Sequence, residues 1–326
     1  MSGKPMRRGV RALAPYFLVT FMLAAHYAHA QRYPSKTIEW ISHTSAGSGT
    51  DLFNRNMSGM LEKEKIFNVP FIHSNRVGGN GLIAYQYVKG KKGDPHVIIA
   101  MAVTVILTQS ILPDTGIALD SVTPIIRVAQ DPQVVAVRSE SKFRTYKELI
   151  DASMDGNVVA GITGPTGSGR MALYYIERDT GAKFKYVTFK GGGDAVLATL
   201  GGHVEVTTEN MSEMLPLVET GKMRLLAVTG ERRFKQAPDV PTLKELGYKT
   251  VVATGRGFGM PPGVPKEAVE TMERALKRVY ESQAYKDYAD RNMFEDAYLN
   301  SADFAKLLVA QRAEQLEFLK AVGIVK

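Results

Sequence analysis

The stretch TIEWISHTSAGSGTDLFNRNMSGMLEKE, residues 37–64, contains the pattern that decides the fold. A short apolar run opens it, and two glycines and three hydroxyls follow in SAGSGTD. An amphipathic run then places four apolar side chains on one helical face: Phe53, Met57, Met60 and Leu61. The sequence predicts a strand, a turn and a helix, with Thr50 or Asp51 as N-cap. Such a turn is typical of an anion site, because the first N–H groups of a helix have no partner within it.

Short apolar runs and helical patterns alternate along the rest of the chain. The expected strands cover residues 37–42, 69–74, 96–102, 132–138, 157–163, 184–189, 203–208, 223–229 and 250–254. Several are apolar and β-branched without alternation, which is typical of parallel strands buried on both faces. A further helix is expected over VETMERALKRVY, with Pro265 near its start. This order predicts a doubly wound α/β fold.

A second glycine-rich turn, GITGPTGSGR (161–170), also joins an expected strand to an expected helix. It differs from a phosphate loop, because Arg170 and Met171 replace the lysine and the hydroxyl residue that nucleotide hydrolysis needs. Two such turns at the carboxyl ends of strands predict two halves that face a common cleft. A plain tight turn is the alternative, as it is for RVGGNG and FKGGGD, where Lys190 is either a ligand contact or a solvated charge.

The composition is that of a globular protein with one large or two medium domains. The chain has 326 residues, 44% hydrophobic and 23% charged, and about half of its formal charge of +8 lies in the first 30 residues. The remaining charge is too mild to indicate nucleic acid. The chain has no cysteine, so it has neither a disulfide nor a lipid-anchoring thiol.

No catalytic, metal or cofactor site is expected. The histidines are scattered without metal-like spacing, and the sequence has neither a G-x-S-x-G elbow nor a cysteine nucleophile. His43, with Ser42, Ser45 and Ser48 nearby, leaves a secreted hydrolase as an alternative, although neighbours in sequence do not make a triad.

Residues 1–30 have the order of a secretory signal peptide. A basic start, KPMRRGVR, precedes the apolar ALAPYFLVTFMLAA, and AHA forms a cleavage site. We expect a mature periplasmic protein that begins near Gln31. Twin-arginine export through Arg7 and Arg8, or an uncleaved membrane anchor, are the alternatives.

From about Tyr33 onward, the sequence resembles the periplasmic solute-binding proteins of tripartite tricarboxylate transporters, often called the Bug family. The resemblance rests on eight segments in the family's order: YPSKTI, SAGSGTD, SNRVGGNG, VTPIIRVAQDPQVVAVR, GITGPTGSG, YVTFKGGGDAVLATLGGHVEVTTEN, MRLLAVTGERR with APDVPTLKELG, and GRGFGMPPGVP. Each segment alone is weak, but the ordered set is specific.

The resemblance implies a two-lobed α/β periplasmic binding protein of type II topology, each lobe a mostly parallel sheet flanked by helices. Lobe 1 is expected over 31–131 and 255–326, and lobe 2 over 132–254, with hinges near PQVVAVR and TVVATG. The expected function is non-enzymatic: a monomer captures an organic carboxylate between its lobes and delivers it to membrane permease subunits. A sensor that presents the ligand to a receptor is an alternative. Tri-, di- and aromatic carboxylates all remain open as ligands.

The resemblance also implies the ligand-binding residues. The first lobe offers Thr44, Ser45, Gly47, Ser48, Gly49, Thr50 and Asp51. The second offers Thr163, Gly164, Thr166, Gly167 and Ser168. Further candidates are Thr104, Asn210, Arg170 and Arg256, and either arginine could meet a second carboxylate. The chain departs from the family pattern at His43, at Gly255 and in MAVTV (101–105), where Val103 and Val105 either line an apolar wall or belong to the core.

Overall fold

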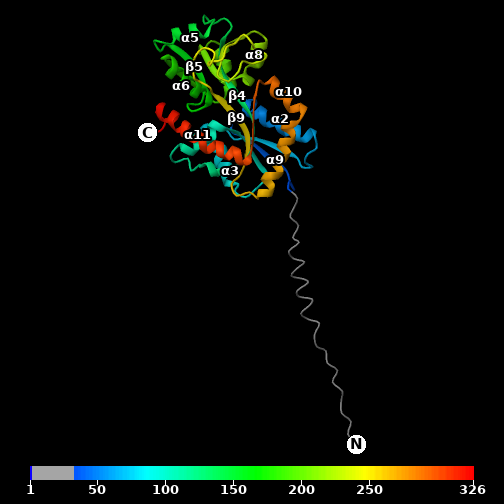
Figure 1. The fold of residues 1–326 in the computed structure, drawn as a ribbon. Helices are drawn as coiled ribbons and strands as arrows, with labels where there is room; N and C mark the ends of the chain where they lie inside the picture. The colour runs from blue at the N-terminus through cyan, green and yellow to red at the C-terminus, as the bar shows by residue number, and fades with distance from the viewer. Residues whose placement is uncertain (2–32) are drawn as a thin grey trace.

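The computed structural model describes Met1 and residues 33–326, so the predicted signal peptide lies almost entirely outside the described residues. Figure 1 shows two lobes joined by long strands. The first sheet contains β1 (Ile38–Ser42), β2 (Phe71–Asn75), β3 (Val97–Ala102), β9 (Ala253–Met260), β10 (Glu295–Asn300) and the first part of β4 (Thr123–Arg138). The second contains the rest of β4 with β5 (Val158–Thr163), β6 (Phe184–Phe189), β7 (Val206–Asn210) and β8 (Met223–Val228).

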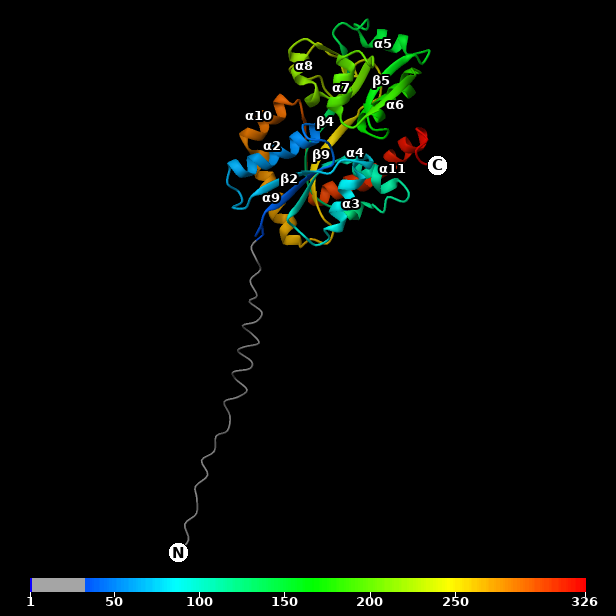
Figure 2. The same cartoon turned by 180° about the vertical axis from the view of Figure 1, so that it is seen from behind.

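Helices cover both sheets, as a doubly wound fold requires. Around the first sheet lie α2 (Gly49–Lys63), α3 (Leu82–Gly90), α4 (Val103–Ile111), α9 (Lys266–Glu281), α10 (Gln283–Arg291) and α11 (Ser301–Ala321). Around the second lie α5 (Tyr146–Ala152), α6 (Ser168–Thr180), α7 (Gly192–Leu200) and α8 (Leu215–Glu219), which Figure 2 shows from behind. None of the described helices is both long and apolar enough to cross a membrane.

The strand order β2-β1-β3-β9-β4-β7-β5-β6 confirms the predicted fold class. Parallel pairs join β1 to β2 and β3, and β5 to β6 and β7. The two strands that run between the lobes, β4 and β9, pair antiparallel because the chain crosses in opposite directions, and β4 also pairs antiparallel with β7 of the second lobe. The exact lobe boundaries remain a prediction.

The opening stretch folds as predicted, with one correction at the helix N-terminus. Phe53, Met57 and Leu61 are fully buried on the inner face of α2. The N-cap is Ser48, and neither Thr50 nor Asp51 takes that position. The Ser48 hydroxyl donates to the Ser45 carbonyl oxygen at 2.6 Å instead of capping the helix.

Three strand segments were not predicted in full. The sequence predicts only 132–138 for β4, 250–254 for β9 and nothing for β10, whereas β4 begins at Thr123 and β9 runs to Met260. The segments ATGRGFGM of β9 and EDAYLN of β10 do not have the apolar pattern of a typical strand, because the first is rich in glycine and the second in polar residues.

Each lobe has its own hydrophobic core. In the first lobe, Trp40, Phe53 and Phe258 form a fully buried aromatic cluster, with Trp40 and Phe258 edge to face at a centroid distance of 5.3 Å. In the second, Val137, Leu149 and other apolar residues gather around β5. A further apolar cluster packs Met171 and Tyr175 of α6 against Phe318 of α11, so the two lobes also contact each other through apolar side chains.

Candidate functional site

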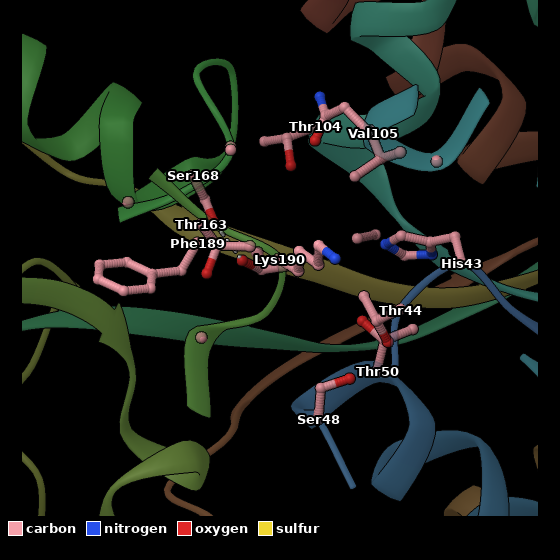
Figure 3. A pocket seen from close by; sticks show the side chains of 18 of the residues that line it. His43, Thr44, Ser48, Thr50, Thr104, Val105, Thr163, Ser168, Phe189 and Lys190 are labelled. Carbon is pink, nitrogen blue, oxygen red and sulfur yellow. Dashed lines mark hydrogen bonds between the residues drawn. The ribbon is translucent and has the colours of Figure 1, made fainter. Parts of the chain in front are cut away.

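A cavity of about 630 Å³ lies between the lobes, at the carboxyl ends of β1, β3, β5, β6 and β7. Ligands in open α/β sheets bind at this edge, where loops and helix N-termini meet. Figure 3 shows that Ser48, Thr50 and Thr44 reach it from the α2 side and that Thr163 and Ser168 reach it from the α6 side. We refer to this cavity as the interlobe pocket.

The interlobe pocket brings together ten of the predicted ligand-binding residues. They are Thr44, Ser48, Thr50, Thr104, Thr163, Gly164, Gly167, Ser168, Asn210 and Arg256. Six others do not line it: Ser45, Gly47, Gly49, Asp51, Thr166 and Arg170. The ligand-binding roles of all of these residues remain a prediction.

Asp51 holds the first turn in shape. Its carboxylate accepts the Gly47 N–H at 2.9 Å, the Arg55 Nε–H at 2.9 Å and the Asn75 amide at 2.8 Å. Burial raises the pKa of Asp51, but these hydrogen bonds outweigh it and hold the pKa below its ordinary value. The Gly47 N–H is therefore already engaged within the turn.

The two predicted arginines have different surroundings. Arg170 lies 3.4 Å from Glu177, with its guanidinium 4.1 Å from the centroid of the Tyr186 ring, outside the pocket. Arg256 lines the pocket but is 2% exposed and makes an ion pair with Asp131, Nη2 to Oδ2, at 2.5 Å. Arg256 also donates to Thr50 Oγ1 at 3.0 Å and to Asn210 Oδ1 at 3.2 Å.

Two glutamates that the sequence analysis did not single out face the interlobe pocket. Glu209, at the end of β7, accepts the Thr163 N–H at 2.6 Å. Glu213, in the 3-10 helix η3 (Met211–Glu213), accepts the Gly49 N–H of the other lobe at 2.9 Å. Their signal in the sequence is VEVTTENMSE, in which acidic residues occur within and directly after a strand that is otherwise buried.

Burial raises the pKa of both glutamates. It raises the pKa of Glu209 to about 8, with a smaller contribution from the charge of Glu213. Burial likewise raises the pKa of Glu213, while the Gly49 hydrogen bond opposes the rise. Near neutral pH, Glu209 is therefore largely protonated.

His43 lines the pocket as a neutral group. It is 7% exposed, and burial, together with the charge of Arg256, lowers its pKa to about 4. Among the described residues, no hydrogen bond joins His43 to a serine, and Nδ1 has no partner. This geometry offers no support for a Ser–His pair, and no group of three His, Cys, Asp or Glu residues in the described part is placed to hold a metal ion.

The apolar contribution to the pocket comes from both lobes. Val103 and Val105 both pack in the first-lobe core, and Val105 also lines the pocket beside Ala102, whereas Val103 does not line it. Phe189 of the second lobe also contributes to the lining (Figure 3). Lys190 is exposed and lines the pocket, with its amine pointing toward His43.

Comparison with known proteins agrees with this geometry. Residues 56–324 match the family model TctC, described as the tripartite tricarboxylate transporter family receptor. Protein BugT of Bordetella pertussis is 26% identical over 84% of this chain and 85% of its own length. The structure of a TctC solute-binding protein from Polaromonas is 30% identical, covers 89% of this chain and 99% of its own, and has a TM-score of 0.67.

A second similar structure shares the fold and contains a ligand. It is the R. palustris protein Rpa4515 with adipate, which is 22% identical, covers 89% of this chain and 98% of its own, and has a TM-score of 0.81. The resemblance inferred from the sequence motifs is therefore confirmed. The match over most of its length shows that this chain belongs to the tripartite tricarboxylate transporter receptor family, TctC.

Proposed function

We propose that this chain is a periplasmic solute-binding protein that captures an organic carboxylate in the interlobe pocket and delivers it to the permease subunits of a tripartite tricarboxylate-type transporter. The observation that carries the proposal is the pocket of about 630 Å³, into which hydroxyls of both lobes converge. Membership of a receptor family and the adipate in a protein of the same fold support it.

The pocket has the features that reversible capture needs. It lies between two lobes joined by β4 and β9, so a bound ligand contacts both lobes and stabilises closure. Its polar lining consists mainly of hydroxyls and amides, whose hydrogen bonds contribute about 0.5–1.5 kcal/mol each. Moderate contacts of this kind suit a carrier that must release its ligand to a partner.

Ligand binding should be tested on the mature protein, beginning at Gln31, with a panel of tri-, di-, mono- and aromatic carboxylates. A ligand at about one hundred times its Kd stabilises the folded state by about 2.7 kcal/mol and raises the melting temperature. Small-angle scattering should show a smaller radius of gyration with a saturating ligand. No binding to any carboxylate, together with hydrolysis of test esters, would replace this proposal with the hydrolase alternative.

Export and delivery complete the proposal and need separate tests. Mass spectrometry of protein from a native periplasm should show a chain that starts at or near Gln31, because AHA ends the predicted signal. The loaded protein should stimulate ligand uptake by vesicles that contain the permease subunits. An intact N-terminal segment in the membrane fraction, or uptake that does not depend on the protein, would contradict these two steps.

A further inference from the structure

A side-chain hydrogen bond joins the two lobes at the rim of the interlobe pocket. The amide of Asn80, in the 3-10 helix η1 (Gly79–Gly81) of the first lobe, donates to the Thr166 hydroxyl of the second lobe. Gly79 and Pro165, which precede these two residues, are exposed, so the bond lies where the pocket meets solvent. The two residues are 86 positions apart in the chain, and their bond forms only when the lobes lie close together.

Asn80 is held in a backbone conformation that few residues with a side chain adopt. Its φ is +51° and its ψ is +48°, in the left-handed region, which asparagine tolerates better than most residues. The buried side chain of Gln109, in α4, holds this turn in place. Its Nε2 donates to the carbonyl oxygens of Gly79 and Asn80 at 3.2 and 2.8 Å. Unfavourable conformations persist where the surrounding structure enforces them, and they concentrate at clamps and switch regions.

The second lobe is shaped to receive the Asn80 amide. A Cβ on Gly164 would lie 2.9 Å from Asn80 Oδ1, so a side chain at position 164 would displace the amide. Thr166 is 3% exposed and does not line the pocket, although Asn80 does. The Thr166 hydroxyl therefore contacts the opposite lobe at a position where it does not reach a ligand in the pocket.

We propose that Asn80 and Thr166 are positioning residues that form a latch, which stabilises the closed form of the protein around any ligand in the pocket. The inference rests on the proposed function and goes beyond it by assigning these residues to closure. A bond that exists only in the closed form stabilises that form alone. In a protein that is mostly open when empty, the latch lowers the apparent Kd by the factor by which it raises the closed population.

The position of the latch predicts which rate constant changes when it is lost. The bond must break before the lobes open and release the ligand, whereas the ligand enters the open form before the bond exists. Loss of the latch should therefore raise the dissociation rate constant and leave the association rate constant nearly unchanged. The factor should be the same for every carboxylate that binds, because the bond does not involve the ligand.

The test compares Asn80→Gly and Thr166→Val with the unmodified mature protein. Asn80→Gly removes the amide and suits the left-handed backbone, and Thr166→Val removes the hydroxyl at constant size. Each should raise the Kd for the two tightest carboxylates of the panel by about two- to tenfold, the factor that corresponds to one hydrogen bond. Calorimetry measures the Kd, and stopped-flow displacement measures the dissociation rate constant.

Two comparisons separate a latch from other roles. The double variant should bind no more weakly than the weaker single variant, because both substitutions remove the same bond. Asn80→Gly should leave the melting temperature of the empty protein nearly unchanged while it raises the Kd, which a purely structural role does not explain. Thr199→Val is the matched control: the Thr199 hydroxyl is buried, bonds within α7 to the Ala195 carbonyl oxygen at 2.9 Å and does not line the pocket. Its Kd should not change.

The closed population can also be measured directly. The chain has no cysteine, so cysteines introduced at the exposed positions Lys92 and Met154, one in each lobe, carry a pair of spin labels. Figure 2 shows that the neighbouring helices α3 and α5 lie at opposite ends of the molecule. With and without the tightest carboxylate, the population at the shorter distance should be smaller in Asn80→Gly and in Thr166→Val than in the labelled parent.

Several outcomes would overturn the latch. They are an unchanged Kd in both variants, additive effects in the double variant, or label distances that neither substitution alters. A raised Kd in Asn80→Gly with an unchanged Kd in Thr166→Val would instead make Asn80 a ligand contact. Failure of the proposed function looks different: no carboxylate of the panel binds the unmodified protein, and the label distances of the empty protein then decide the latch by themselves.

Discussion

The two glycine-rich turns have the same order of strand, turn and helix, yet they are built differently. In the first, at 43–51, Gly47 has a φ of +82°, and a Cβ there would meet no atom within 4 Å, whereas a Cβ on Gly49 would lie 2.9 Å from Glu213 Oε1. The second, at 163–169, is tightly packed, because a Cβ on Gly169 would lie 2.1 Å from the carbonyl oxygen of Thr208. Each turn also has a glycine in the left-handed region, Gly47 in the first and Gly164 in the second, so the turns differ in what Gly49 and Gly169 approach: a side chain of the other lobe in the first and a backbone carbonyl in the second.

The arginines near the two turns also have different surroundings. Arg256 contacts the first turn through Thr50 and is buried with Asp131. Arg170 lies in the first turn of α6, but its side chain pairs with Glu177 away from the pocket. The comparison teaches that an arginine beside an anion-type turn need not bind the anion, since burial and the available acid decide its partner.

The largest expected difference is in the free energy of unfolding that is lost when each of the two arginines is replaced. Arg256→Met should lower the free energy of unfolding by about 3–5 kcal/mol, because it leaves the fully buried Asp131 unpaired. Arg170→Met breaks a partly exposed pair and should cost about 1 kcal/mol or less. Urea unfolding of both variants measures the difference. Adding Asp131→Asn to Arg256→Met should restore part of the loss, and equal losses in the two single variants would contradict the comparison.

The next largest effect is on the pH dependence of the free energy of unfolding, to which His43 of the first lobe and Glu209 of the second contribute in opposite directions. The folded pKa of His43 falls from its ordinary 6.5 to about 4, so the unfolded chain binds more protons between these values. Its contribution is complete above pH 6.5 and is lost as the pH falls through this window, by up to about 3 kcal/mol. Burial raises the pKa of Glu209 from 4.5 to about 8, so its contribution is complete below pH 4.5 and declines as the pH rises to 8.

Variants should separate these two responses. In urea unfolding over a pH series, His43→Asn should flatten the acid side of the stability profile, and Glu209→Gln should flatten the decline from acid to neutral pH and above. A profile that keeps its acid slope in His43→Asn would show that other groups cause it.

Replacing Gly169 and Gly47 by alanine compares the cost of close packing with the cost of a left-handed backbone conformation. Gly169→Ala inserts a methyl group against a carbonyl oxygen and should cost about 1–3 kcal/mol of stability. Gly47→Ala has room for its methyl group and should cost only the left-handed penalty, about 1–2 kcal/mol. Thermal and urea unfolding of the pair should place Gly169→Ala as the less stable variant, and the reverse order would be evidence against the packed second turn.

The smallest expected effects come from the serines of the two turns. Ser48 donates to the Ser45 carbonyl, and the Ser168 hydroxyl lies 2.7 Å from Thr254 Oγ1 on the crossing strand. Ser48→Ala and Ser168→Ala should each weaken carboxylate binding by about 0.5–1.5 kcal/mol, the usual net value of one hydrogen bond. Calorimetry with the tightest ligand of the carboxylate panel is the measurement. Unchanged affinity in both variants would mean that the turns do not touch the ligand.

Local patterns in the sequence predicted much of the fold. The spacing of Phe53, Met57 and Leu61 predicts α2 because a helix brings such positions onto one face, and the structure buries them together. Most of β9 and all of β10 were not predicted, because pairing with β4, rather than any local preference of their residues, makes them strands.

The same distinction applies to the candidate site. The sequence alone determined the two strand–turn–helix units and the hydroxyls that they carry to the pocket, because the geometry of such a turn is set by residues adjacent in the chain. Only the tertiary structure decided that Glu213 meets Gly49 and that Arg256 meets Asp131, pairs separated by 164 and 125 residues. Contacts of this range depend on how the two lobes cross at β4 and β9, and burial there sets the charge of the acids.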